Sequence, residues 1–355
     1  MPRPIGKSIS KTFFMRHRKG NITDVFRNPS CLNKTFQRIF CKVLDKSDVD
    51  VLTDLMSRSP KQTEYSITDR AHITKCPFDK VISSCTPVHW LCSLGLKQIL
   101  ELVLSRSDNK PEFINSLQGR VTPLHIAAGH GQLEVVKYLL EDIGVNVNEK
   151  LNETFDDEHN IDEQYAGCSP LHFAASQNFQ EVVACLLQNE ADPNLINDHG
   201  CSSMLLAARS GYKVVVDYLL RYGGNPNLSC NDGTTPLMSA AQEGHFDTML
   251  TLIDGKADLN LQNNEEKSKQ SALLLATRYG RIQCVKGLIE KGADKELSDI
   301  HGTSPLLVAL LNEKYETAKY LFQLGASINA KNIEGKSPIE VTKSLNINLF
   351  DNLSG

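Results

Sequence analysis

The stretch Thr122-Pro123-Leu124-His125-Ile126-Ala127-Ala128 decides how this 355-residue chain folds, because variants of it recur along the sequence. The copy Ser169-Pro170-Leu171-His172-Phe173-Ala174-Ala175 repeats it almost residue for residue. Successive copies begin at Thr86, Thr122, Ser169, Ser202, Thr235, Ser271, Ser304 and Ser337. Self-similarity with a period of about 33 residues is typical of proteins built by stacking one small structural unit.

Each copy has the residues that begin a helix. The Thr or Ser can cap the first helix by accepting a hydrogen bond from an amide of the first turn. The following proline suits the first helical position, where its missing N–H costs nothing. A second apolar stripe, such as Val135-Val136 and Leu139-Leu140, predicts a second helix. Glycines such as Gly223, Gly255, Gly292 and Gly325 then predict the end of that second helix.

The T-P-L-H-x-A core and its period resemble the ankyrin repeat family, from Thr86 to the C-terminus. The resemblance implies an all-α solenoid of about eight stacked helix–turn–helix units with β-hairpin loops. It also implies that the motif histidines hydrogen-bond between neighbouring turns instead of binding metal. Motif positions with a structural role in the family are Thr122, Pro123, His125, Ser169, Pro170, His172, Thr235, Pro236, Ser304 and Pro305.

Three segments are predicted. Residues 1–32 form a basic tail, which we expect to be a disordered arm. A nuclear localisation signal, a contact for an anionic partner and a mitochondrial presequence are its alternatives. Residues 33–85 are predicted to be a degenerate N-terminal capping repeat followed by a long connection. Residues 86–355 form the ankyrin repeat domain, with a truncated C-terminal cap from Ser337.

An acidic insertion near 149–166 lengthens one hairpin of the repeat domain. We expect a solvated loop, because insertions in repeat proteins map to loops. A contact site for a basic partner and a docking site for the basic tail are the alternatives. The spacing of its carboxylates does not fit a calcium-binding loop.

Composition and motifs argue against an enzyme. The net charge is only −4, the ten cysteines contain no C-x-x-C pair, and no run of 18 apolar residues occurs. Gly335-Lys336-Ser337 resembles the end of a phosphate-binding loop, but Ala330 stands where that loop needs its first glycine. We therefore expect no catalytic residue, metal ligand, cofactor, small-molecule substrate or membrane contact. Nucleic acid would bind only weakly, through the basic tail, and the expected location is the cytoplasm or the nucleus.

The ankyrin resemblance implies that a partner protein binds on the concave side, which is made by hairpin tips and the exposed ends of the first helices. The candidate contact residues are Asp198, His199, Arg209, Ser210, Asn231, Asp232, Gln242, Glu243, Arg278, Tyr279, Ile300 and His301. The same positions in other repeats hold Gly129, His130, Ser176, Gln177, Leu311, Asn312, Ile333 and Glu334.

A modification site is also suggested by resemblance. Five hairpin asparagines each follow a leucine by eight residues, a pattern similar to that recognised in asparaginyl β-hydroxylation of ankyrin domains. They are Asn148, Asn194, Asn227, Asn260 and Asn329. The alternative is a turn asparagine that bonds its own backbone.

The sequence thus predicts a non-catalytic scaffold that binds another protein. One alternative is an adaptor or substrate receptor that recruits partners to a larger complex such as a ubiquitin ligase. Another is an inhibitor of a transcription factor of the I-kappa-B type. A third, of a different class, is an enzyme within residues 1–85.

Overall fold

The computed structural model describes residues 87–105, 121–151, 165–264 and 268–345, which contain most of the repeats. The predictions for residues 1–32 and 33–85 lie outside these ranges, as does most of the acidic insertion. The chain divides into two units, Met1–Val145 with Asn152–Glu163 and Asn146–Leu151 with Gln164–Gly355. We describe each unit by itself.

Within its described residues, the first unit contains two repeats of the helical pattern. The helices described there are α4 (Pro87–Leu94), α5 (Lys97–Ser105), α7 (Pro123–Gly129), α8 (Leu133–Lys137) and the π-helical turn η3 (Tyr138–Ile143). Helix α4 packs against α5 and α7, and α7 packs against α8. The ring of His89 also joins the repeats, because its Nε2 lies 2.8 Å from the carbonyl oxygen of Val121.

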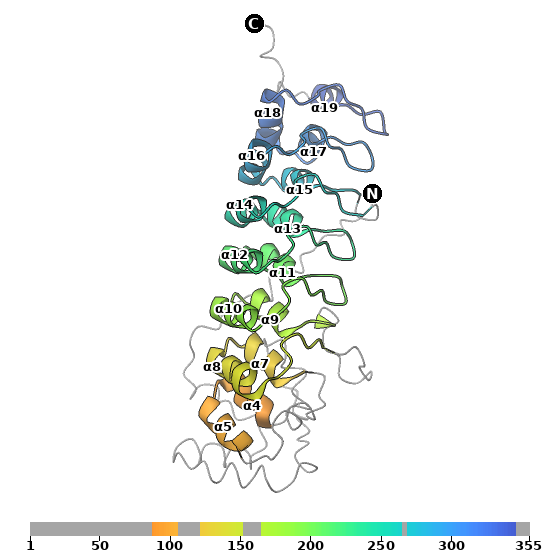
Figure 1. Ribbon diagram of the computed structural model, residues 1–355. Coiled ribbons are helices and arrows are strands. Elements are labelled where there is room, and N and C mark those ends of the chain that lie inside the picture. Colours follow the sequence, from red (N-terminus) through yellow and green to blue (C-terminus); the bar gives the residue numbers. More distant parts are fainter. Residues whose placement is uncertain (1–86, 106–120, 152–164, 265–267, 346–355) are drawn as a thin grey trace, which may run out of the picture. The chain divides into compact units, whose positions relative to one another are not determined.

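The second unit continues the pattern through eleven described helices. They are α9 (Pro170–Ser176), α10 (Gln180–Gln188), α11 (Ser203–Arg209), α12 (Lys213–Arg221), α13 (Pro236–Glu243), α14 (Phe246–Asp254), α15 (Ala272–Arg278), α16 (Ile282–Glu290), α17 (Pro305–Leu311), α18 (Tyr315–Gln323) and α19 (Pro338–Ser344). The odd-numbered helices from α9 to α19 pack on one another in order and form an inner row. The even-numbered helices from α10 to α18 form an outer row (Figure 1). The predicted all-α stack of helix–turn–helix units is confirmed.

Local chemistry explains where the inner helices begin. The hydroxyl of Thr235 accepts a hydrogen bond from the amide of Met238, with Pro236 at the first helical position. Ser202, Ser271 and Ser304 cap their helices in the same way. The alanine pairs that follow Ser169, Ser202 and Thr235 are fully buried, which lets neighbouring inner helices approach closely. These are Ala174, Ala175, Ala207, Ala208, Ala240 and Ala241.

Left-handed glycines follow three of the outer helices as predicted, but Gly255 is different. Gly223, Gly292 and Gly325 have φ angles of 84°, 98° and 76°. Gly255 instead has a φ of −76°, and Lys256 takes the left-handed conformation with a φ of 71°. A Cβ atom on Gly255 would lie 2.7 Å from the side chain of Leu220. Position 255 therefore needs a glycine for close packing against Leu220 and not for a left-handed backbone conformation.

The hairpins between repeats project from the same side of the second unit (Figure 1). Four hairpins are each closed by a backbone hydrogen bond between residues four apart, such as that from the amide of Asn197 to the carbonyl of Cys201 at 3.0 Å. In the hairpin between α14 and α15, the closing bond runs instead from the amide of Asn263 to the carbonyl of Gln270 at 3.1 Å. Within the described ranges the hairpins contain two isolated β-bridges, Ile196 with Ser202 and Gln262 with Ser271. No strand longer than a single bridge occurs in these ranges. Neighbouring tips are also linked, as by the amide of Asn231, which donates to the carbonyl of His199 at 3.0 Å.

Candidate protein-interaction surface

The hairpin tips and the C-terminal ends of the inner helices α11, α13, α15 and α17 form one surface of the second unit, which we call the hairpin face. All twelve predicted contact residues lie on it within the described part of the chain, and none is buried. The exposed members are His199, Arg209, Asn231, Tyr279, Ile300 and His301. The half-buried members are Asp198, Ser210, Asp232, Gln242, Glu243 and Arg278.

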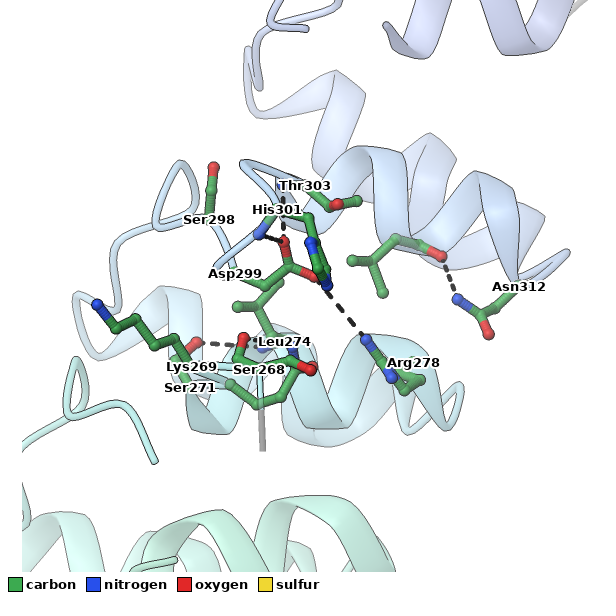
Figure 2. Close-up of polar contacts among 12 residues, drawn as sticks. Ser268, Lys269, Ser271, Leu274, Arg278, Ser298, Asp299, His301, Thr303 and Asn312 are labelled. Atoms are coloured by element: carbon green, nitrogen blue, oxygen red, sulfur yellow. Dashed lines mark hydrogen bonds and ion pairs between the residues drawn. The ribbon is translucent and has the colours of Figure 1, made fainter. Parts of the chain in front are cut away.

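A charged cluster on the hairpin face joins α15 to the next hairpin (Figure 2). The Nη2 atom of Arg278 lies 4.0 Å from Oδ2 of Asp299, whose side chain is only 4% exposed. The other carboxylate oxygen of Asp299 accepts hydrogen bonds from the amides of His301 and Thr303, each at 2.9 Å. Asp299 is thus held inside the hairpin, and its remaining oxygen faces the guanidinium group.

Arg278 retains unused hydrogen-bonding capacity. Its Nε atom is buried and has no hydrogen-bond partner among the described residues. Its ion pair with Asp299 sits at the long end of the usual range, and 40% of its side chain is exposed. A guanidinium group offers five donors in a planar fork, so the exposed part of this group can still donate hydrogen bonds to a carboxylate of a partner.

Large apolar side chains are exposed beside this cluster. Tyr279 follows Arg278 and is 49% exposed, and Leu311 at the end of α17 is 46% exposed. Ile300 and Ile333 stand on successive hairpins, and Ile333 reaches 74% exposure. Aromatic and arginine side chains are enriched among residues that dominate protein–protein binding energy. The hairpin face therefore combines apolar area with a charged anchor at its C-terminal end.

Several hairpin candidates also serve the fold. The Nδ2 atom of Asn231 donates to the carbonyl of Asp198 at 3.1 Å, which links successive tips. Oδ1 of Asp232 accepts a hydrogen bond from the amide of Thr234 at 3.0 Å. Asp198 lies 3.8 Å from Nζ of Lys150 in an ion pair. Replacing these residues would disturb hairpin structure, so they are poor probes of binding alone.

His172, the motif histidine of the repeat that begins at Ser169, links its own repeat to the next one. The amide of Ser169 donates to Nδ1 of His172 at 3.2 Å, which leaves the proton on Nε2. That Nε2 lies 3.0 Å from the carbonyl oxygen of Cys201 in the next repeat and donates to it. Burial lowers the pKa of His172 to about 4, as it does for His89, so both rings are neutral at pH 7. His125 similarly contacts its own cap, with Nδ1 lying 2.8 Å from Oγ1 of Thr122.

Four of the five hairpin asparagines bind the following hairpin instead of their own turn, namely Asn148, Asn194, Asn227 and Asn260. Oδ1 of Asn148 accepts from the amide of Asp192 at 2.8 Å, and Oδ1 of Asn227 accepts from the amide of Asp258 at 2.8 Å. The turn itself is made by the side chain two residues earlier, as where Asp192 accepts from the amide of Asn194. The alternative of a turn asparagine bonding its own backbone is therefore wrong for these four positions, and no described contact tests it at Asn329. Their hydroxylation stays a prediction.

The described residues contain no group of three or more His, Cys, Asp or Glu side chains that could hold a metal ion. Among the described helices, none combines the length and apolarity that a bilayer-spanning helix needs. The six cysteines that the structure describes are buried free thiols.

Comparison with known proteins identifies the class of fold. A family model described as ankyrin repeats in three copies matches residues 51–150, 152–229, 171–263 and 256–332. These matches extend over more than half of the chain, so the protein belongs to the ankyrin repeat family. The first match begins inside the segment for which the sequence predicts a degenerate repeat.

A similar solved structure is the crystal structure of the human ASB11 ankyrin repeat domain. The two share 27% sequence identity with a TM-score of 0.52, over 62% of this chain and 91% of that chain. In all, 492 chains of solved structures match, and so wide a match identifies a fold without identifying a partner. Ankyrin repeats form protein–protein interaction domains, and the family is typically non-catalytic.

Proposed function

We propose that this protein is a non-catalytic scaffold that binds another protein through the hairpin face, the side that the ankyrin resemblance describes as concave. The observation that carries the proposal is the grouping of Arg278, Tyr279, Leu311, Ile300 and Ile333 on that face. A surface held by stacked helices and linked hairpins is preformed, so little binding free energy is lost in ordering it. The buried free thiols favour a reducing compartment, the cytoplasm or the nucleus.

The test is capture of partners from cell lysate with the full chain as bait. The binding variant changes Arg209, Arg278 and Tyr279 to alanine. The matched control changes Arg221, Tyr222 and Lys291 to alanine, which are exposed at the ends of the outer helices α12 and α16. A third bait lacks residues 1–32. We expect a partner that is retained by the control and by the truncated bait, and lost by the binding variant.

Two other results would contradict the proposal. Loss of the partner only on removal of residues 1–32 would make the basic tail the binding element. Loss in the control but not in the binding variant would place binding on the outer helices. Identification of the captured partner separates the two alternatives, since an adaptor would bring down ligase subunits and an inhibitor would bring down a transcription factor.

A further inference from the structure

One hairpin of the second unit departs from the pattern that closes the others. In four hairpins an Asn or Asp side chain accepts backbone amide hydrogen bonds from within the same loop. These residues are Asn197, Asn263, Asp299 and Asn332. Cys230 occupies the equivalent position in the remaining hairpin, and Asp232 takes over loop closure by accepting from the amide of Thr234. The loop therefore does not need a thiol for its own structure.

The register of the repeats places this thiol against a second one. The side chain of Asn197 reaches back one repeat, where its Nδ2 lies 3.5 Å from the Sγ atom of Cys168. One repeat later, Cys230 and Cys201 occupy these same two positions. Their side chains share a buried cluster with Leu205. The two cysteine side chains thus pack together across consecutive hairpins.

The two thiols differ chemically from the other buried cysteines. They are 8% and 9% exposed, whereas the other four described cysteines are at most 4% exposed. Interaction with the neighbouring Cys230 side chain and the nearby charge of Arg209 lower the pKa of Cys201, against the opposing effect of burial. The pKa of Cys230 is raised by the same pair interaction and by burial, and its thiol donates to Oδ1 of Asp232 at 2.8 Å. The positive charge of Arg209 near Cys201 favours its thiolate as the nucleophile, whereas Cys230 beside the Asp232 carboxylate is left as the resolving thiol.

We propose that Cys201 and Cys230 are a modification site that forms a reversible disulfide between two consecutive hairpins, with a small disulfide such as glutathione disulfide as the oxidant. The Cys201 thiolate attacks one sulfur of the oxidant and releases one small thiolate, which leaves a mixed disulfide. Cys230 passes its proton to the carboxylate of Asp232, attacks the sulfur of Cys201 and releases the second small thiolate. The two protein thiols lose two electrons, and the oxidant becomes two thiols once the protons are transferred.

This inference does not depend on the proposed function, although it bears on the same face. Asn231 and Asp232 directly follow Cys230 on the hairpin tip. Oxidation removes the hydrogen bond from the Cys230 thiol to Asp232. The disulfide also ties the tip to the preceding hairpin by a covalent bond.

The test uses the full reduced chain, which has ten cysteines. It is incubated with glutathione disulfide, the remaining thiols are alkylated, and tryptic peptides are mapped without reduction. We expect the peptide that contains Cys230 to be linked to the peptide that ends at Arg209 and holds Cys201. The intact protein should lose about 2 Da and regain it with a reducing agent. When the chain is oxidised in denaturant, the link between Cys201 and Cys230 should no longer be favoured over links between other cysteines.

Single-residue variants identify the partner sulfur, because Cys168 and Cys185 lie on the same tryptic peptide as Cys201. C201S and C230S should abolish the link, and C168S and C185S should keep it. A link that survives in C201S, or no link to Cys230 in the wild-type chain while other cysteines become oxidised, overturns the proposal. If C201S fails to fold, the maps of C168S and C185S still decide the question, because Cys201 is the one cysteine of that peptide present in both variants.

Discussion

The side chain of Asn194 fastens its own hairpin to the one that contains Asn225. Its Oδ1 atom accepts a hydrogen bond from the amide of Asn225 at 2.7 Å, and its Nδ2 atom donates to the carbonyl of Gly223 at 3.0 Å. Where a later repeat has Glu296 in place of asparagine, its carboxylate accepts from the amide of Ser327 at 3.0 Å. One polar side chain per repeat thus joins the backbone of consecutive hairpins.

Replacing Asn194 with alanine should therefore destabilise the second unit. The change removes two hydrogen bonds to backbone groups of the next hairpin, and we expect the free energy of unfolding to fall by about 1–3 kcal/mol. Asn329 is the matched control, because it has the same place in its repeat and is exposed. Asn329→Ala should change stability by less than about 0.5 kcal/mol. Equal effects in urea denaturation would show that the cross-hairpin bonds contribute nothing.

Hydroxylation of these asparagines is tested separately by mass. If an asparaginyl β-hydroxylase modifies the chain, peptides that contain Asn194 or Asn227 from cells should carry an increment of about 16 Da. Asn194 is exposed, but its bonds to the next hairpin mean that this hairpin must open to present it. Protein purified from cells that shows no such increment on any of the five asparagines removes the hypothesis.

His172 should make stability depend on pH in a defined direction. Burial lowers its pKa to about 4 in the folded chain, whereas an exposed histidine in the unfolded chain titrates near 6.5. Between these pH values only the unfolded chain takes up the proton, so the free energy of unfolding falls as the pH drops from about 6.5 to about 4. The loss attributable to this ring is about 3 kcal/mol.

The chain itself offers the replacement for that experiment, because other repeats have Leu205, Leu274 and Leu307 at the histidine position. His172→Leu should weaken the pH dependence between pH 7 and pH 4 by about the amount given above. At pH 8 it should cost only about 1 kcal/mol, for the lost bond to the carbonyl of Cys201. Parallel curves for the variant and the wild-type chain, measured by urea denaturation at each pH, would contradict the assignment.

The helices and their boundaries were predictable because their causes are local. Thr235, Pro236 and the alanines that follow act within one or two turns, so their spacing alone indicates a capped helix packed closely against a neighbour. The links between hairpins were not predictable from composition. Which backbone group Asn194 reaches depends on the register of two repeats that is set only by packing. Gly255 shows the same limit, since its glycine is required by the side chain of Leu220 one repeat away.

For the candidate site too, the sequence predicted which residues are accessible but not which contacts they make. Alignment of the repeats placed Arg278 and Tyr279 on an accessible surface, because the position within a repeat determines exposure. It could not show that Arg278 approaches the buried carboxylate of Asp299, which belongs to the next hairpin. Nor could it show that the side chain of Asn231 is occupied in linking two tips.

The binding residues should be separable from stability. Tyr279 and Arg209 are exposed, so their replacement by alanine should change the free energy of unfolding by less than about 0.5 kcal/mol. Arg278→Ala should cost about 1–3 kcal/mol, because it leaves the buried carboxylate of Asp299 without its ion partner. A larger loss in thermal or urea unfolding would mean that binding defects in the triple variant report misfolding.

Two glycines with nearly the same backbone test whether successive hairpins touch as the structure shows. Gly200 and Gly335 have φ angles of 73° and 75°, so alanine at either position is strained by about 1–2 kcal/mol. A Cβ atom on Gly200 would also lie 2.7 Å from the amide nitrogen of Asn231, whereas none of the described atoms lies within 4 Å of one on Gly335.

Gly200→Ala must therefore push the next hairpin away, which breaks the hydrogen bond from the amide of Asn231 to the carbonyl of His199. We expect it to cost about 1–3 kcal/mol more than Gly335→Ala in urea denaturation. Amide hydrogen exchange of Asn231 should also accelerate in Gly200→Ala and stay unchanged in Gly335→Ala. Equal costs for the two variants, with Asn231 still protected, would mean that the two hairpin tips are farther apart than this hydrogen bond requires.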